Sequence, residues 1–133
     1  MSRAMKGSAL VIGGAGFLGS HVADALTDSG YEVYIYDRVQ SQYLRNDQRM
    51  ILGSIEDEAS LLTAMSGVDY VFHLAAIADI ASCNQNPMAA IESKILGSAR
   101  VFESCYKSKV QKIIFASSIY VYSDSGGFYR ATK

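Results

Sequence analysis

Residues 11–20, VIGGAGFLGS, decide the fold, because an apolar run passes directly into glycines spaced three apart at Gly13, Gly16 and Gly19. A tight passage from a strand into a helix needs such residues, since glycine tolerates backbone angles that side chains forbid and lets main chains approach closely. Helical spacing of apolar residues continues through FLGSHVADALTDSG, residues 17–30, and the final glycine is a good helix terminator. The stretch therefore predicts a strand, a glycine turn and a helix.

Four more short runs rich in Val, Ile, Phe and Tyr follow along the chain. Near-continuous apolar runs of this length are typical of strands covered on both faces of a parallel sheet. The predicted strands, in addition to the first at ALVIGG, are EVYIYD (32–37), RMILG (49–53), DYVFHLAA (69–76) and KIIFASS (112–118).

The segments between these runs predict two more helices and a loop. EDEASLLTAMSG, residues 56–67, has acidic residues in its first turn and a glycine at its end, as a helix would. A longer helix is expected from Asn86 as cap and Pro87 as first helical residue to about Ser108, with a buried stripe. We predict that this stripe contains Ile91, Ile95, Val101, Phe102 and Cys105. Residues 38–48 are polar and are expected to form a loop.

Alternating strands and helices joined by right-handed crossovers indicate an α/β fold. The expected architecture is a doubly wound, Rossmann-type parallel sheet of about five strands in the order 3-2-1-4-5. The sequence contains no internal repeat and no composition that suggests a linker. We therefore expect a single domain over residues 1–133.

Composition narrows the class of protein. The 133 residues are 50% apolar with a formal net charge of -1, as in one globular domain. No apolar run approaches the roughly 20 residues that span a membrane, and the start MSRAMKGS is too short for a secretory leader. The expected location is the cytoplasm, without membrane contact. Scattered Lys and Arg give no basic patch for nucleic acid.

The two cysteines suggest neither a metal site nor a disulfide. Cys83 and Cys105 fit no metal-ligand spacing, and without secretory context they are expected to be reduced thiols. His73 lies inside an apolar run and is expected to be a neutral core histidine. We therefore predict no metal.

The glycine turn and the acid after the second strand predict a dinucleotide site. Free N–H groups at Phe17 and Leu18, with the positive end of the helix, would hold a pyrophosphate. Asp37 ends the second strand eighteen residues after Gly19, where its carboxylate can accept from adenosine ribose hydroxyls. That charge would repel a 2′-phosphate and favours NAD over NADP, although Arg38 could instead bind such a phosphate. For Asp37 alone, a solvated acid at a strand end stays an alternative.

The motifs GGAGFLG, Asp37, FHLAA, ASSIYVY and YRATK occur in that order, and with them the chain resembles the short-chain dehydrogenase/reductase superfamily. It is similar to the extended branch of NAD-dependent nucleotide-sugar epimerases and dehydratases. The resemblance runs through nearly all of the chain and implies an NAD(P)-binding domain. It also implies truncation, because the C-terminal part of the usual fold is missing.

Carried over residue by residue, the resemblance implies a complete set of cofactor contacts. Ser54 stands where the family usually has an Asp near the adenine, which weakens that one contact. The implied contacts are Gly13, Gly16, Phe17 and Leu18 to the pyrophosphate; Asp37 to the ribose; Ser54 and Ile55 to the adenine; Leu74, Ala75 and Ala76 beneath the cofactor; and Tyr129 and Lys133 at its nicotinamide end. Arg38, directly after Asp37, is a further candidate contact, to a 2′-phosphate.

The resemblance also implies the catalytic residues Ser118, Tyr129 and Lys133. Tyr129 would be the acid/base, and Lys133, four residues later on the same helical face, would favour its phenolate. Ser118 would hold the reacting sugar oxygen, whereas neighbouring Ser117 is expected to bond to the backbone. Lys94 replaces a family asparagine that is usually structural, so we expect it to alter local geometry more than chemistry.

Three functions remain open from the sequence. The first is a nucleotide-sugar epimerase or reductase, since Ile119 and Tyr120 replace the Asp and Glu with which dehydratases remove water. The second is a dinucleotide-binding fragment or remnant without turnover that needs a partner or the missing C-terminal lobe. The third is a structural interaction protein with a vestigial glycine turn. The resemblance further implies a homodimer through the fourth and fifth helices.

Overall fold

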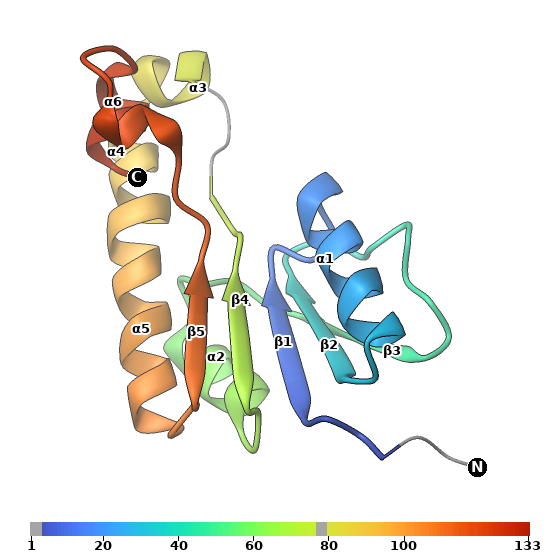
Figure 1. Ribbon diagram of the computed structural model, residues 1–133. Helices are drawn as coiled ribbons and strands as arrows, with labels where there is room; N and C mark the ends of the chain where they lie inside the picture. Colours follow the sequence, from blue (N-terminus) through green and yellow to red (C-terminus); the bar gives the residue numbers. More distant parts are fainter. Residues whose placement is uncertain (1–3, 77–79) are drawn as a thin grey trace.

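Five parallel strands form the sheet, and their order is the one that the sequence predicts. The computed structural model describes residues 4–76 and 80–133, and its strands lie in the order β3-β2-β1-β4-β5 (Figure 1). Each predicted apolar run overlaps one strand. The strands are β1 (Ser8–Ile12), β2 (Glu32–Asp37), β3 (Gln48–Leu52), β4 (Tyr70–His73) and β5 (Lys112–Phe115).

The helices α1, α2 and α5 cover the faces of the sheet, and α3 and α6 lie beyond the carboxyl ends of its strands (Figure 1). As predicted, residues 38–47 between β2 and β3 contain no helix. In Figure 1 the strand arrowheads point towards the end of the molecule where α3 and α6 lie. The helices are α1 (Phe17–Asp28), α2 (Glu58–Met65), α3 (Ile80–Gln85), α4 (Pro87–Ala90), the π-helix η1 (Ile91–Leu96), α5 (Gly97–Lys107), the 3-10 helix η2 (Ile119–Tyr122) and α6 (Gly127–Ala131).

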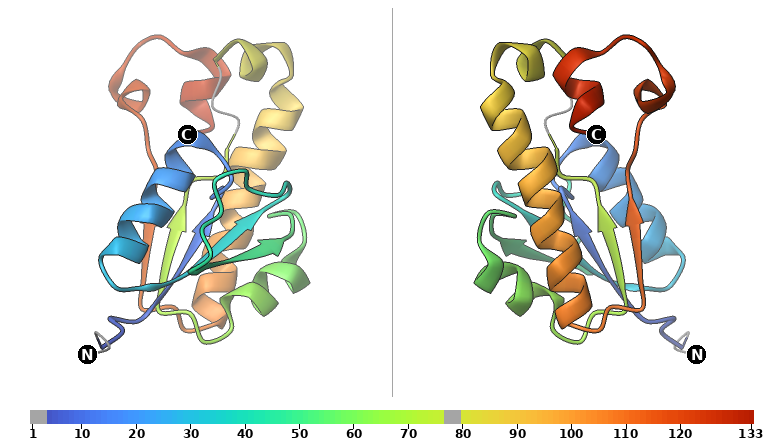
Figure 2. Two further views of the ribbon diagram at one scale, coloured as in Figure 1. Left: turned by 90° about the vertical axis from the view of Figure 1, so that its right-hand side faces the viewer. Right: turned by 90° about the vertical axis from the view of Figure 1, so that its left-hand side faces the viewer.

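The core has two layers, one on each face of the sheet. Leu10 and Ile12 of β1 pack with residues of α2 and α5, including Val101. Val11 faces the opposite way and packs with Ala23 of α1. This alternation follows from the two-residue period of a strand, and it explains why β1 is buried along its whole length. Figure 2 shows α1 and α5 on opposite sides of the sheet.

The long helix after Asn86 begins and ends as predicted but is not uniform. The Asn86 side chain accepts a hydrogen bond from the N–H of Ala89 at 3.1 Å, and Pro87 occupies the first turn. The run α4, η1 and α5 then ends at the cap Ser108. The π-helical segment in its middle was not predicted. Such segments occur mostly as local bulges, often at functional sites.

Part of the stripe predicted for this helix is wrong. Val101 and Cys105 are buried, as expected, and burial raises the pKa of Cys105 to about 11. Ile95 and Phe102, however, are 45% and 43% exposed. The π segment changes the angular spacing between the first and last residues of the helical run. Because the sheet also ends at β5, the sheet does not cover these two side chains. The Phe102 ring still contacts that of Phe115.

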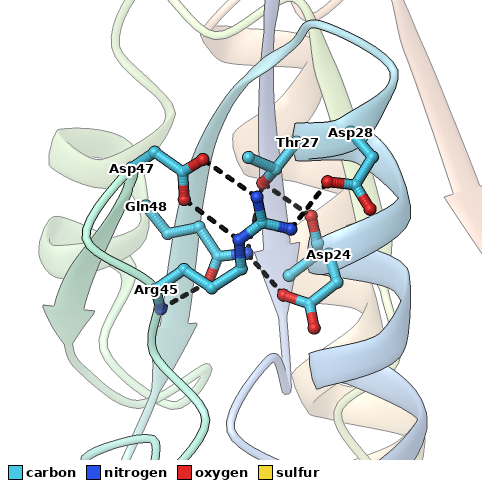
Figure 3. A network of polar contacts seen from close by, with 7 residues as sticks. Asp24, Thr27, Asp28, Arg45, Asp47 and Gln48 are labelled. Atoms are coloured by element: carbon cyan, nitrogen blue, oxygen red, sulfur yellow. Dashed lines mark hydrogen bonds and ion pairs between the residues drawn. The ribbon is translucent and has the colours of Figure 1, made fainter.

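A polar cluster ties the loop between β2 and β3 to α1 (Figure 3). Arg45 forms ion pairs with Asp28 at 2.8 Å and with Asp47 at 3.0 Å. Below it, buried Gln48 donates from Nε2 to Asp24 at 2.8 Å and to Thr27 Oγ1 at 3.1 Å, and the Gln48 side chain accepts from the Arg45 N–H. These contacts fix the path by which the chain returns from β2 to β3.

Candidate functional site

A cleft of about 550 Å³ lies at the carboxyl ends of the strands. Ligands of doubly wound sheets bind at this end, next to the point where the strand order reverses. Here that point lies between β1 and β4. Every residue predicted to contact a dinucleotide lines this one cleft, namely Gly13, Gly16, Phe17, Leu18, Asp37, Arg38, Ser54, Ile55, Leu74, Ala75, Ala76, Tyr129 and Lys133. Their roles as ligand contacts stay predictions.

The glycine turn between β1 and α1 leaves no room for side chains at two positions. Gly13 has a φ of 82°, and a Cβ there would lie 2.7 Å from the main-chain N of Ala75. At Gly19 a Cβ would overlap the carbonyl oxygen of Gly13. The turn therefore needs glycine for its backbone angle at the first position and for close packing at the second.

The first turn of α1 presents main-chain donors to the cleft. The first intrahelical hydrogen bond runs from the N–H of Ser20 to the carbonyl of Gly16 at 2.9 Å. The N–H groups of Phe17, Leu18 and Gly19 precede that bond, so they have no acceptor within the helix. All three residues line the cleft. Donors of this kind, at the positive end of a twelve-residue helix, suit a phosphate.

Asp37 lies at the end of β2, and the backbone holds its carboxylate beside the glycine turn. Its Oδ2 accepts from the N–H of Ala15 at 3.1 Å, and its Oδ1 accepts from the N–H of Val39 at 3.3 Å. Each oxygen can accept a further hydrogen bond. Arg38 also lines the cleft and is exposed. The rim thus offers one fixed anion and one exposed cation.

The segment after β3 is positioned by a buried tyrosine. The Tyr36 hydroxyl donates to the carbonyl of Ser54 at 2.8 Å and contacts Ser60 Oγ at 2.9 Å, and burial raises the pKa of Tyr36. Ser54 Oγ accepts from the N–H of Glu56 at 3.2 Å. Glu56 also lines the cleft, which the sequence did not indicate. A carboxylate therefore lies near the position where the expected family Asp is replaced by serine.

Tyr129 of α6 and Lys133, two residues after the end of that helix, lie at the other end of the cleft. The start of α6 is fixed by the N–H of Phe128, which donates to Asn84 Oδ1 of α3 at 3.1 Å. The ring of Tyr120 packs edge-on against that of Tyr129, with 5.7 Å between centroids. The Nζ of Lys133 lies 6.0 Å from the centroid of the Tyr129 ring. The two side chains therefore lie near each other, but Lys133 follows the last residue of α6, so the shared helical face stays a prediction.

The two serines after β5 lie the opposite way from our expectation. Ser118 does not line the cleft, because it caps η2 and its hydroxyl accepts from the N–H of Tyr120 at 3.3 Å. Ser117 does line it. Neighbouring side chains of an extended segment point in opposite directions, so only one of the pair can face the cleft. A catalytic role for Ser118 stays a prediction, and Ser117 is the hydroxyl that the sequence alone undervalued.

His73, at the end of β4, is buried in the core as expected. Its Nε2 is 2.9 Å from Ser98 Oγ, and its ring packs against Phe115. Burial, with a smaller contribution from the charge of Lys133, lowers the pKa of His73 to about 4. The imidazole is therefore neutral at pH 7.

Other classes of site are not found in the described part of the chain. Within residues 4–76 and 80–133, no three His, Cys, Asp or Glu side chains come together as a metal site requires. No helix there combines the length and apolar character needed to cross a lipid bilayer. Neither Cys83 nor Cys105 is in a disulfide.

Comparison with known proteins gives a family match over almost the whole chain. Residues 9–132 match the model of the NAD dependent epimerase/dehydratase family. The chain is 36% identical over 124 residues to a UDP-N-acetyl-alpha-D-glucosaminuronate decarboxylase of Bacillus cytotoxicus, covering 89% of this chain and 38% of the relative. It is 32% identical over 123 residues to a UDP-glucose 4-epimerase of Rickettsia conorii, covering 82% and 36%.

A solved structure supports the same relationship. The UDP-glucose 4-epimerase of Brucella ovis in complex with NAD has a TM-score of 0.83 and 30% sequence identity to this chain. The match covers 88% of this chain and 37% of that protein. The chain therefore spans less than two fifths of the length of these relatives.

Proposed function

The chain belongs to the NAD-dependent epimerase/dehydratase family, and from this premise we propose that it is the NAD-binding portion of a nucleotide-sugar epimerase or reductase. One observation carries the proposal: the glycine turn, the Asp37 carboxylate and the Tyr129–Lys133 pair all line one cleft. A cofactor that lies along the cleft would therefore place its phosphates at one end and its reactive end beside the tyrosine.

The residues of the cleft fit NAD. The unbonded N–H groups of Phe17 and Leu18 suit its pyrophosphate, and Asp37 has acceptor capacity left for two ribose hydroxyls. Because that carboxylate is held in place by the backbone, a 2′-phosphate would meet a fixed negative charge. This repulsion favours NAD over NADP, with exposed Arg38 as the opposing influence.

The reaction we propose oxidises a sugar alcohol to a ketone. NAD, when bound, supplies the hydride acceptor. Tyr129 takes the proton of the substrate hydroxyl as the carbon-bound hydrogen leaves with its electron pair, and Lys133 stabilises the phenolate that accepts this proton. A serine after β5 holds the reacting oxygen, Ser118 by resemblance or Ser117 by its place in the cleft. Return of the hydride to the other face of the ketone would give an epimer.

Titration calorimetry with NAD and NADP tests the cofactor assignment. We expect NAD to bind more tightly, and Asp37→Asn to reduce that preference by about tenfold or more, the usual consequence of removing a charged hydrogen-bond acceptor. Asp124→Asn is the matched control, because Asp124 is exposed and does not line the cleft. Failure of the wild-type chain to bind either nucleotide would contradict the proposal.

A reduced-nicotinamide signal tests turnover. With NAD and a panel of UDP- and dTDP-sugars, one class of sugar should either raise the absorbance at 340 nm, as net oxidation does, or be converted to its epimer. Tyr129→Phe should abolish either result while NAD still binds. Activity that survives in Tyr129→Phe would refute the assigned acid/base.

The second candidate is a dinucleotide-binding portion that does not turn over alone. The exposed edge favours it, because Ile114 and Phe115 of β5 are 37% and 38% exposed and an open strand edge can pair with further chain. NAD binding with neither a signal at 340 nm nor conversion of any sugar to its epimer would select this candidate.

A further inference from the structure

Lys94 is a buried lysine that the proposed reaction does not use. It lies in the π-helical segment η1, and the residue is 3% exposed. Its Nζ donates to the main-chain carbonyl of Tyr129 at 3.0 Å and lies 3.8 Å from the centroid of the Tyr129 ring. The Nζ of Lys133 is farther from that centroid, at 6.0 Å. The cation closest to the tyrosine ring is therefore not the one that the YRATK motif supplies.

We propose that Lys94 is a second positioning cation of Tyr129, which holds the tyrosine through its carbonyl and stabilises its phenolate. The inference rests on the proposed role of Tyr129 as acid/base. The neutral asparagine that the family resemblance led us to expect at this position could not supply the charge. The lysine supplies a hydrogen bond and a charge to the same residue.

The surroundings of Lys94 leave its charge available to the phenol. Within residues 4–76 and 80–133, no carboxylate forms an ion pair with it. Burial keeps water away, so a charge is screened less than it would be at the surface. Two ionisable neighbours remain. One is Cys83 of α3, whose Sγ is 3.9 Å from Nζ, and the other is Lys133, whose like charge acts on Lys94.

The other groups packed around α6 do not supply a comparable charge at this distance. From η2, Tyr120 presents a neutral ring to Tyr129, and α4 consists of Pro87–Ala90, which has no ionisable side chain. On α6 itself Arg130 is exposed. Lys133 is thus the one other cation in contact with Tyr129 among the described residues.

The state of Lys94 itself is consistent with this role. Burial lowers the pKa of Lys94, the neighbouring Cys83 side chain opposes that shift, and the charge of Lys133 adds to it. Any negative charge that forms nearby therefore stabilises the ammonium form of this lysine. Coupling between two sites is reciprocal, so a phenolate at Tyr129 must stabilise the Lys94 ammonium as much as the ammonium stabilises the phenolate.

Titration of the Tyr129 ring tests the proposal without any substrate. In the full chain carrying ¹³Cζ-tyrosine, the Tyr129 resonance is assigned by its loss in Tyr129→Phe, and its chemical shift is followed against pH. Lys94→Met, which removes the charge and keeps most of the length of the side chain, should move the midpoint upward by about one pH unit, a tenfold change. Lys94→Arg should keep the midpoint within a few tenths. A folded Lys94→Met with an unchanged midpoint would overturn the proposal, since a merely structural role would alter stability alone.

A reciprocal measurement keeps the proposal testable where Lys94→Met does not fold. The ¹⁵Nζ resonance of Lys94, identified by its loss in Lys94→Arg, should titrate at lower pH in Tyr129→Phe than in the wild type. Equal titration in both would refute the coupling. Neither measurement needs NAD. Failure of NAD binding would therefore contradict the proposed function without affecting the Lys94–Tyr129 result. Absence of coupling between Lys94 and Tyr129 would contradict this inference without affecting the test of NAD binding.

Discussion

The two ends of the cleft are built in different ways. At the phosphate end, β1 is buried along its whole length and the turn after it is set by backbone sterics, because Gly13 and Gly19 have no space for a Cβ. At the reaction end, β5 is largely exposed, and Tyr129 is placed by side chains from other elements, including Lys94 and Asn84. The first end depends on local backbone geometry, and the second depends on tertiary contacts.

Because of this difference, a single substitution should have different effects at the two ends of the cleft. A methyl group added to the glycine turn must displace main chain, since backbone atoms surround it. A change at the reaction end meets flexible side chains and alters charge or orientation more than path. We therefore expect the largest effects at the phosphate end, with effects at the reaction end that depend on pH.

Gly19→Ala should have the largest effect. Its Cβ would overlap the Gly13 carbonyl oxygen and lie 2.7 Å from Gly14 Cα, so unfolding free energy should fall by about 3 kcal/mol and NAD binding should be lost. Chemical denaturation and calorimetry measure the two effects. Gly67→Ala is the control. Its φ of 74° is unfavourable for alanine, but nothing lies within 4 Å of the added atom. This substitution should lower the unfolding free energy by about 1 kcal/mol and leave NAD binding unchanged. Equal effects of the two substitutions would remove the contrast between the two ends.

Lowering the pH should reduce the unfolding free energy through His73, which lies near the reaction end. Because its pKa is lowered to about 4 in the folded chain, against about 6.5 when unfolded, the unfolded chain takes up the proton first as pH falls. Stability from this group is therefore complete above pH 6.5 and is lost towards pH 4, by up to about 3 kcal/mol. Denaturation of wild type and His73→Gln across this range should reveal the difference. His21→Gln, on the exposed surface of α1, should keep the wild-type dependence of unfolding free energy on pH. If His73→Gln keeps the same dependence, His73 is not its cause.

Gln48→Met should have the smallest effect of the three. It removes the donors to Asp24 and Thr27 and the acceptor of the Arg45 N–H, which should lower the unfolding free energy by about 2 kcal/mol. NAD binding should stay within about twofold, because the glycine turn does not depend on this cluster. Gln42→Met, exposed in the same loop, should change neither quantity. Loss of NAD binding in Gln48→Met would show that the phosphate end also relies on side-chain contacts.

The sequence predicts the phosphate end well because its determinants are local. Glycine spacing after an apolar run fixes a turn wherever the chain goes afterwards, and buried strands are recognisable from their apolar runs. Asn86 and Pro87 likewise predict the start of the long helix, because capping involves neighbouring residues only. The sheet order follows from the crossover rule, and it is confirmed.

The reaction end could be predicted only in part. The spacing of Tyr129 and Lys133 predicts a shared face, yet nothing local places Lys94, 35 residues earlier, against the same ring. Which of Ser117 and Ser118 lines the cleft depends on the direction of one extended residue before η2, and apolar runs do not encode that direction. The exposure of Ile95 and Phe102 depends on the π segment and on the end of the sheet, which are tertiary features.

The π-helical segment has one further consequence, which concerns angular phase. An α-helix advances about 100° per residue, so a segment that holds an extra residue in its turn offsets everything after it by about that angle. The run from Pro87 to Lys107 thereby aims Lys94 at α6 while Val101 and Cys105 still face the sheet. Deletion of a single residue within Ile91–Leu96 would restore a uniform helix. Such a helix could point Lys94 at α6 or keep Val101 and Cys105 on the sheet, but it could not do both.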